Sequence, residues 1–317
     1  MKILITGGAG FIGSNLAAKL IKEGYKVFII DNLSSGKKEN IPKEAIFYKA
    51  DIRNLDKILQ LFKGIDCVFH LAANPKVVYS VQNPIETHDI NVNGTLNVLY
   101  ASYKNKVKRL IFASSSAVYG NIHRQKQTKR GHNGHIQTNK IVPLRENMNP
   151  NPISPYGLHK LIGEYYCKIF SYLYNLETVC LRYFNVYGPK MDPEGPYALV
   201  IGKFLKLSKE NKPLTIYGDG KQTRDFIFVD DVVSANILAM KSKKVGRGEV
   251  INICSGKNYS INYIAKLIGG KKIYLQARKG EMRHTLGDNS LAKKLLDWQP
   301  KISLEEGIEI CKNYFRI

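Results

Sequence analysis

The chain has 317 residues, of which 44% are hydrophobic and 23% charged, as in an ordinary globular protein with a substantial core. No apolar run approaches the ~20 residues that a membrane helix needs, and the apolar run at the N-terminus is too short for a secretory signal. The net charge is +22, yet no nucleic-acid-reading motif accompanies it. Five scattered cysteines favour reduced thiols. We therefore expect a cytoplasmic protein that binds neither membrane nor nucleic acid.

The first predicted strand, Lys2–Thr6, runs into a glycine-rich turn with G-x-x-G-x-x-G spacing, and an amphipathic helix is expected to follow over Ser14–Glu23. The first glycine permits a sharp turn off the strand, and the second lets the backbone approach a pyrophosphate. The third lets the helix pack closely on the sheet, while free N–H groups at the helix start face the phosphates. The pattern predicts that a dinucleotide is bound by Gly7, Gly10, Phe11, Ile12 and Gly13.

The second predicted strand, Lys26–Asp31, ends in an acid 18 residues after Gly13. A carboxylate at that place accepts a hydrogen bond from the ribose 2′-hydroxyl of NAD and repels the 2′-phosphate of NADP. The sequence therefore predicts NAD as the cofactor, with Asp31 and the adjacent Asn32 at its adenosine end.

Strand and helix continue to alternate up to Tyr183, as a doubly wound parallel sheet requires. The further strands are expected at Ile46–Lys49, Cys67–Leu71, Arg109–Ser114 and Glu177–Tyr183, and the further helices at Leu55–Phe62, Ile90–Lys104 and Tyr156–Leu173. Beyond Tyr183 turns become frequent and helices short, which favours a smaller lobe. We predict an α/β fold of Rossmann type, with an NAD-binding domain over 1–182 and a mainly substrate-binding lobe over 183–317, of which 226–255 crosses back to the sheet.

Two further stretches at predicted strand ends suit the cofactor. Asp51 and Ile52 follow the third strand and would lie over the adenine. The fourth strand ends in small residues, which leave room for the dinucleotide at Leu71, Ala72 and Ala73. In a parallel sheet these ends share the edge at which such folds bind ligands.

One long polar stretch, 121–143, interrupts the alternation and shows no periodicity. It carries His123, His132 and His135. Zinc binding is conceivable there, but neither a cysteine nor an acid lies nearby to complete a site. We therefore expect a solvated insertion and no metal.

A pair of residues with catalytic character, Tyr156 and Lys160, opens the helix predicted over Tyr156–Leu173. The i, i+4 spacing puts both side chains on one helical face. A neighbouring ammonium stabilises a phenolate, so we expect the tyrosine pKa to fall from ~10 towards the range of a general base. Three serines at 114–116 end the preceding strand and can reach the same ligand.

These motifs together resemble the extended short-chain dehydrogenase/reductase superfamily, and within it nucleotide-sugar epimerases of the UDP-glucose 4-epimerase type. The resemblance runs nearly end to end. It includes Ser114–Gly120, Ser154–Lys160, Leu181–Gly188, Ile216–Phe226 and Arg278–Glu281.

The resemblance implies a role for each matching residue. Tyr156 is the base, Lys160 binds the nicotinamide ribose, and Ser115 hydrogen-bonds the reacting oxygen, with Ser116 as the alternative. Asn91, Tyr183 and Lys76 or its neighbours would line the cofactor, although Pro75-Lys76 departs from the family pattern. The substrate side would be formed by Asn185, Arg224, Arg278, Glu281 and Thr285, the two arginines suiting a diphosphate.

The implied reaction is C4 epimerisation of a UDP-hexose through a transient 4-keto sugar. A 4,6-dehydratase is less compatible, because Ser116 and Ala117 stand where such enzymes carry an acidic pair. A non-catalytic NAD-binding regulator would not need the Ser115, Tyr156, Lys160 set. A UDP-glucuronate epimerase or decarboxylase is not distinguished by the sequence.

Thr285 stands where the family limits the space beside the sugar 2-substituent. Because threonine is small, interconversion of UDP-GlcNAc and UDP-GalNAc is the alternative activity. By the same resemblance we expect a homodimer that pairs through the helices Ile90–Lys104 and Tyr156–Leu173.

Overall fold

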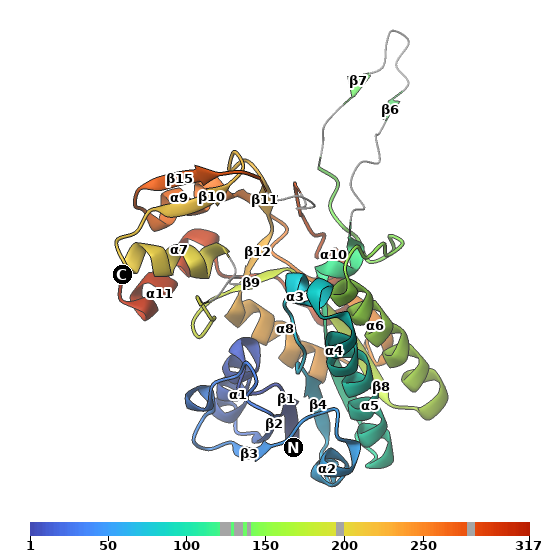
Figure 1. Cartoon of the computed structure of the whole chain (residues 1–317). Helices are drawn as coiled ribbons and strands as arrows, with labels where there is room; N and C mark the ends of the chain where they lie inside the picture. The colour runs from blue at the N-terminus through green and yellow to red at the C-terminus, as the bar shows by residue number, and fades with distance from the viewer. Residues whose placement is uncertain (121–127, 130–135, 138–140, 195–199, 278–282) are drawn as a thin grey trace.

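The computed structural model describes residues 1–120, 128–129, 136–137, 141–194, 200–277 and 283–317 (Figure 1). Its centre is a seven-stranded sheet with the strand order β13-β8-β5-β4-β1-β2-β3. Every neighbouring pair runs parallel, which confirms the predicted doubly wound α/β fold. The strands are β1 (Lys2–Thr6), β2 (Lys26–Asp31), β3 (Ile46–Lys49), β4 (Cys67–His70), β5 (Arg109–Ser115), β8 (Glu177–Tyr183) and β13 (Arg247–Ile253).

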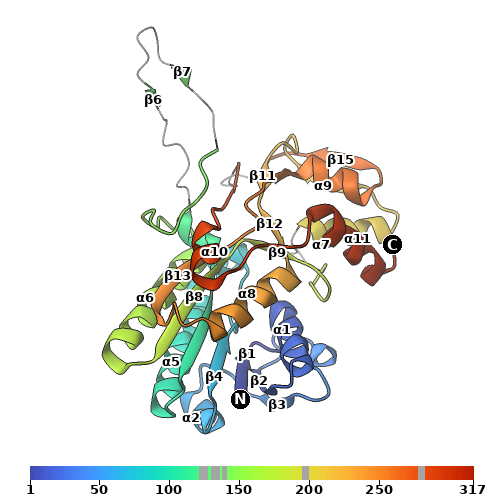
Figure 2. The same cartoon turned by 180° about the vertical axis from the view of Figure 1, so that it is seen from behind.

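Both faces of the sheet are buried, because alternate residues of each central strand enter different cores. In β1, Ile3 and Ile5 join one cluster and Leu4 joins the other. The first face is covered by α1 (Phe11–Lys22) and α8 (Val229–Lys241), and the second by α2 (Leu55–Leu59), α5 (Gly94–Lys104) and α6 (Pro155–Tyr174). Figure 2 shows α1 and α8 from behind.

The predicted boundaries hold with small differences. The first helix begins at Phe11 rather than Ser14. Gly13 therefore lies inside the helix, where it packs against the carbonyl of Gly7 and leaves no room for a side chain. The fourth strand ends at His70, one residue early, and the fifth extends to Ser115. The second predicted helix divides into α2 and a 3₁₀ turn over Gln60–Phe62, and the third into a π-turn over Asp89–Asn93 followed by α5.

Most of the residues after Tyr183 form a lobe beside the sheet's carboxyl edge, while α8 packs on the sheet and β13 joins it as the seventh strand, next to β8. The lobe's core is continuous with that of the α1 and α8 face. The predicted domain boundary at residue 182 stays a prediction. The remaining elements are α7 (Val200–Lys209), α9 (Ile261–Ile268), α10 (Ser290–Leu296), α11 (Leu304–Phe315), β9 (Asn185–Tyr187), β10 (Leu214–Tyr217), β11 (Thr223–Arg224), β12 (Phe226–Phe228), β14 (Tyr259–Ser260) and β15 (Lys272–Leu275).

Between β4 and α5 lie two short helices, α3 (Val77–Gln82) and α4 (Pro84–His88), and Ser116–Tyr119 forms a 3₁₀ turn directly after β5. Within the stretch expected to lack regular structure, β6 (Thr128–Lys129) pairs antiparallel with β7 (Ile136–Gln137). All five cysteines are buried free thiols. Across the described residues, no helix combines the length and apolar character needed to cross a membrane.

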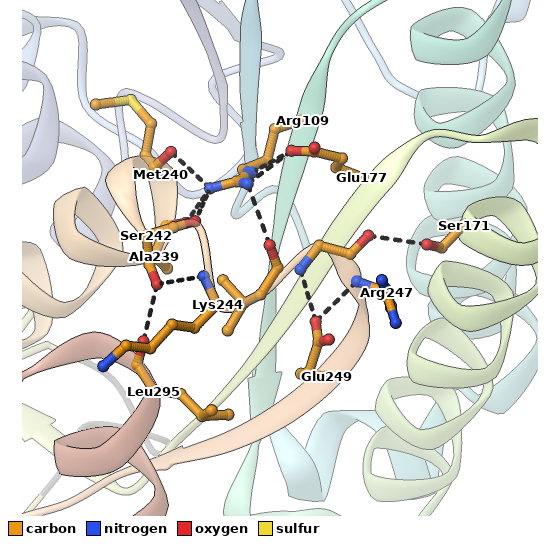
Figure 3. A network of polar contacts seen from close by, with 12 residues as sticks. Arg109, Ser171, Glu177, Ala239, Met240, Ser242, Lys244, Arg247, Glu249 and Leu295 are labelled. Carbon is orange, nitrogen blue, oxygen red and sulfur yellow. Dashed lines mark hydrogen bonds and ion pairs between the residues drawn. The ribbon is translucent and has the colours of Figure 1, made fainter.

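A half-buried arginine at the end of the strands away from the carboxyl edge holds β13 in place. Arg109 at the start of β5 donates to the carbonyl oxygens of Ala239, Met240 and Ser242 at the end of α8. Its guanidinium also bonds Val245 O at 3.1 Å and the Glu177 carboxylate at 2.7 Å (Figure 3). One side chain therefore connects β5, β8, the end of α8 and the start of β13.

Candidate functional site

The glycine-rich turn forms a tight cradle between β1 and α1. Gly7 has a φ of 74°, and a Cβ there would lie 2.7 Å from the backbone nitrogen of Ala72. A Cβ on Gly13 would lie 2.2 Å from the carbonyl oxygen of Gly7. Gly10 is the extended N-cap of α1, so the helix start directly follows the turn, with Phe11 and Ile12 in its first turn. This arrangement leaves backbone N–H groups at a helix N-terminus for an anionic group.

Three polar residues lie at the ends of β2 and β3. The Asp31 carboxylate accepts hydrogen bonds from the backbone N–H groups of Ala9 (3.0 Å) and Leu33 (2.8 Å), so the acid is held beside the glycine-rich turn. Asn32 donates to Asp51 at 2.8 Å. A hydrogen-bonded ion pair with Arg53 lowers the pKa of Asp51 to about 2. The predicted adenosine-side residues are thus neighbours in one network, and Ile52 is buried beneath it.

The end of β4 is held in place by a chain of buried hydrogen bonds near the sheet's carboxyl edge. His70 lies between the hydroxyls of Thr6 (2.7 Å) and Thr95 (2.9 Å), and burial lowers its pKa to about 3. The carboxamide of Asn91 accepts from the backbone N–H of Asn74 and donates to its carbonyl. Asn91 therefore positions the loop that follows β4. That loop contains Leu71, Ala72 and Ala73, which are half-buried, and Lys76.

Local sequence explains where α6 begins and how closely it approaches the 3₁₀ turn after β5. The Ser154 side chain caps the helix by accepting from Gly157 N, and Pro155 occupies the first helical position, as both residue types favour. A Cβ on Gly157 would lie 2.6 Å from the carbonyl oxygen of Ala117, so only glycine permits this approach. The backbone N–H of Tyr156 donates to Ser80 of α3 at 3.1 Å. The start of α6 is thereby held against both the 3₁₀ turn Ser116–Tyr119 and α3.

The structure brings Ser115, Tyr156 and Lys160 together. Tyr156 and Lys160 are buried on one face of α6, with the Lys160 ammonium 5.9 Å from the centre of the Tyr156 ring. Lys160 Nζ donates to Ala113 O at 2.7 Å and lies 4.9 Å from the centre of the Phe112 ring. Ser115, the last residue of β5, hydrogen-bonds Tyr156.

The expected fall in the tyrosine pKa is not seen in the protein alone. Burial raises the pKa of Tyr156, and the hydrogen bond with Ser115 opposes this without overcoming it. Burial also lowers the pKa of Lys160 to about 8. The sequence predicted the pairing of the two groups, but it could not give the desolvation that both undergo.

A buried ion pair behind these residues was missed in the sequence. Glu164, one helical turn after Lys160, binds Arg182 of β8 through two hydrogen bonds of 2.8 and 2.7 Å. Ser114 also donates to Glu164, and the Arg182 guanidinium lies 4.6 Å from the centre of the Tyr119 ring. Lys160 and Glu164 share the i, i+4 spacing of Tyr156 and Lys160, which is the signal that could have indicated an acid on the buried face.

The predicted substrate residues gather in part. Asn185 begins β9 and donates to Asp225 O at 2.8 Å, and the Thr285 hydroxyl accepts from Asp225 N at 3.3 Å. Arg224 adjoins Asp225 and is half-buried. Arg278 and Glu281 lie outside the described residues, so their placement stays a prediction.

Tyr183 and the histidines complete the predicted set. Tyr183 ends β8 and donates to Asn236 of α8 at 2.9 Å. His123, His132 and His135 fall outside the residues whose positions are described. Within the described residues, no three or more histidine, cysteine or acidic side chains gather as a metal site would require.

Comparison with known proteins assigns this arrangement to a family. The model of the NAD dependent epimerase/dehydratase family matches residues 3–254. Among solved structures, the chain is similar to the UDP-glucose 4-epimerase of Thermotoga maritima with UDP-glucose. The two chains are 40% identical with a TM-score of 0.90, over 100% of this chain and 99% of that one.

Two other similar proteins carry different sugars in their names. One is the UDP-N-acetylglucosamine 4-epimerase of Methanobrevibacter ruminantium, solved with UDP-N-acetylmuramic acid, which is 36% identical with a TM-score of 0.89 over 99% of this chain and 98% of that one. The other is the UDP-glucuronate 4-epimerase of Thermodesulfobacterium geofontis, 36% identical over 98% of this chain and 95% of that protein. The identity of the sugar therefore varies among relatives of similar closeness.

Proposed function

Because the chain belongs to the NAD dependent epimerase/dehydratase family, we propose that it interconverts UDP-glucose and UDP-galactose by epimerisation at C4. The cofactor is NAD, and the relatives named above act on UDP-sugars. The observation that carries the proposal is that Ser115, Tyr156 and Lys160 lie together at the carboxyl edge of the sheet. A protein that only bound the dinucleotide would have no need of a phenol, a hydroxyl and an ammonium assembled there.

The residues present fit NAD. The glycine cradle tolerates no side chain at Gly7 or Gly13, and the helix start behind it suits a pyrophosphate. Asp31 is held beside this turn by two backbone N–H groups, where a ribose hydroxyl can donate to its remaining lone pairs. When bound, NAD supplies the acceptor and later the donor of a hydride.

The chain's own residues manage the proton and the sugar. The phenolate form of Tyr156 takes the proton of the sugar 4-hydroxyl, and Ser115 hydrogen-bonds that oxygen. Lys160 is oriented by Ala113 O, and its positive charge favours the phenolate over the phenol. The 4-keto sugar then turns within the site, and the proton returns from Tyr156 to the product oxygen.

Replacement of Tyr156 by phenylalanine tests this assignment. Since the phenolate of Tyr156 is the proton acceptor, we expect Tyr156→Phe to lose at least ~100-fold in turnover while the purified protein keeps its bound NAD. Tyr25→Phe, at a half-buried tyrosine following α1, is the matched control and should retain wild-type turnover. A Tyr156→Phe protein with unchanged turnover would exclude this mechanism.

Interconversion of UDP-GlcNAc and UDP-GalNAc is the second candidate. It is supported by the small side chain of Thr285, which is almost fully buried beside Asp225 and so adds little bulk next to the sugar.

We further propose that two copies pair through α5 and α6. On α6 the exposed apolar residues Leu158, Tyr165, Ile169 and Tyr172 recur at intervals of seven, four and three residues, the spacing of one helical stripe. Tyr100 and Tyr103 of α5 are exposed on the neighbouring helix. An exposed apolar face of this kind favours burial against another chain.

The five buried free thiols support the reducing cytoplasm as the location of the protein.

A further inference from the structure

Asp225 has no role in the chemistry described above, yet its backbone and side chain contact three separate segments of the chain. Its carboxylate is fully buried. One oxygen accepts from the backbone N–H (2.8 Å) and the hydroxyl (2.7 Å) of Ser255, and the other from the backbone N–H groups of Gly256 (3.1 Å) and Gly287 (3.0 Å). Each oxygen thus accepts two hydrogen bonds.

The backbone of Asp225 reaches the candidate substrate residues directly. Its N–H donates to the Thr285 hydroxyl, and its carbonyl accepts from both the backbone N–H (3.2 Å) and the carboxamide (2.8 Å) of Asn185. Arg224 precedes it in the chain. Asn185, Arg224 and Thr285 come from three different elements or loops, so their mutual placement depends on a residue that touches all of them.

We propose that Asp225 is a positioning residue for the nucleotide-sugar site, with its buried carboxylate fixing the Thr285–Gly287 segment and the loop that follows β13 against Arg224 and Asn185. This inference rests on the proposed function, in that the site so assembled takes a nucleoside diphosphate sugar. Asp225 itself does not touch the reacting atoms. Its loss should therefore weaken substrate binding while leaving the catalytic trio and the NAD site intact.

The arrangement of donors makes asparagine an informative replacement. An NH₂ group in place of the oxygen facing Gly256 and Gly287 would meet two backbone N–H donors, neither of which can turn into an acceptor. In place of the other oxygen it would still face the backbone N–H of Ser255, although the Ser255 hydroxyl could rotate. Either way at least one donor is left without a partner, and a hydrogen bond to a carboxylate is lost.

The test compares Asp225→Asn with the wild type as purified. We expect the KM for the converted UDP-sugar and the Kd for UDP to rise about tenfold or more, as loss of a hydrogen bond to a charged group would give, with kcat within about threefold and bound NAD unchanged. Asp219→Asn is the matched control, because Asp219 is an exposed acid of the same lobe paired with Arg283; its KM should stay within about twofold. If Asp225→Asn does not fold, Ser255→Ala removes one of the four donors and should raise KM about two- to fourfold.

The outcomes separate this proposal from the proposed function. A wild type that binds UDP but converts no UDP-sugar would overturn the function, while the UDP Kd of the variant would still decide the role of Asp225. An Asp225→Asn protein with wild-type KM and Kd overturns the positioning role, as does a loss shared equally by kcat, KM and NAD content. Failure of the wild type to bind UDP would overturn both.

Discussion

At the scale of single residues, the ammonium group of Lys160 is buried between the rings of Phe112 and Tyr156, with the carbonyl of Ala113 as its hydrogen-bond acceptor. Burial lowers its pKa from 10.5 to about 8. A base whose pKa is lower in the folded protein than in the unfolded chain destabilises the fold at every pH at which the folded protein must carry its charge. That cost is absent above pH 10.5 and is complete below about pH 8.

We therefore predict that Lys160→Met abolishes turnover but stabilises nucleotide-free protein at neutral pH. The lowered pKa of Lys160 corresponds to a destabilisation of the fold by about 3 kcal/mol at pH 7, which Lys160→Met removes. Loss of the hydrogen bond to Ala113 O offsets about 1 kcal/mol of this gain. The free energy of unfolding should thus rise by about 2 kcal/mol at pH 7, and the gain should shrink as pH approaches 10.5.

Denaturant unfolding at pH 7 and pH 10 measures this difference. Lys168→Met, at an exposed position of the same helix, is the control and should change stability by no more than about 0.5 kcal/mol at either pH. A Lys160→Met protein that is less stable than wild type at pH 7 would show that the ammonium is a net stabiliser of the fold.

At the scale of elements, the candidate site depends on the relative placement of β5, β8 and β13, and Arg109 holds these strands together at their far ends (Figure 3). β5 spans seven residues, so its two ends lie roughly 20 Å apart. A change at Arg109 can therefore alter stability without touching the site.

We predict that Arg109→Met lowers the free energy of unfolding by about 3 kcal/mol, because the carbonyls at the end of α8 and the carboxylate of Glu177 lose a shared charged donor. Turnover per folded molecule should stay at the wild-type value below the unfolding transition. Arg247→Met, at an exposed position that starts β13, should have little effect on either property. Loss of turnover in a fully folded Arg109→Met protein would contradict this separation of fold and site.

The elements that the sequence predicted best are those with a strong period or a strict geometric need. The strands of the parallel sheet are recognisable in the sequence as short apolar runs. The turn at Gly7 and Gly13 is recognisable because it admits no side chain and therefore requires glycine. Burial is a property of the whole fold and cannot be read from one motif. The predicted fall in the pKa of Tyr156 was therefore wrong, because burial raises it. Asp225 lies in the stretch Ile216–Phe226 and Glu164 one helical turn after Lys160, but their hydrogen-bond partners come from segments distant in the sequence. Only the folded structure shows what these two acids hold in place.

At the scale of the whole molecule, the apolar stripe on α6 leads to a prediction about assembly. Tyr165→Glu combined with Ile169→Glu places two charges on the proposed contact face, so we expect a dimeric wild type to become monomeric, as measured by sedimentation. Tyr274→Glu combined with Ile273→Glu adds the same charges on the exposed strand β15 and should leave the dimer intact. A wild type that sediments as a monomer at micromolar concentration would contradict the pairing.

The central claim, a UDP-sugar 4-epimerase that retains its own NAD, is tested most directly by incubating purified protein with UDP-galactose, UDP-GalNAc or UDP-galacturonate without added cofactor. We predict that UDP-galactose is converted to its C4 epimer, as resolved by NMR, and that UDP-GalNAc is converted as well if the small Thr285 leaves room for the acetamido group. Conversion of none of the three, even after NAD is supplied, would contradict the account.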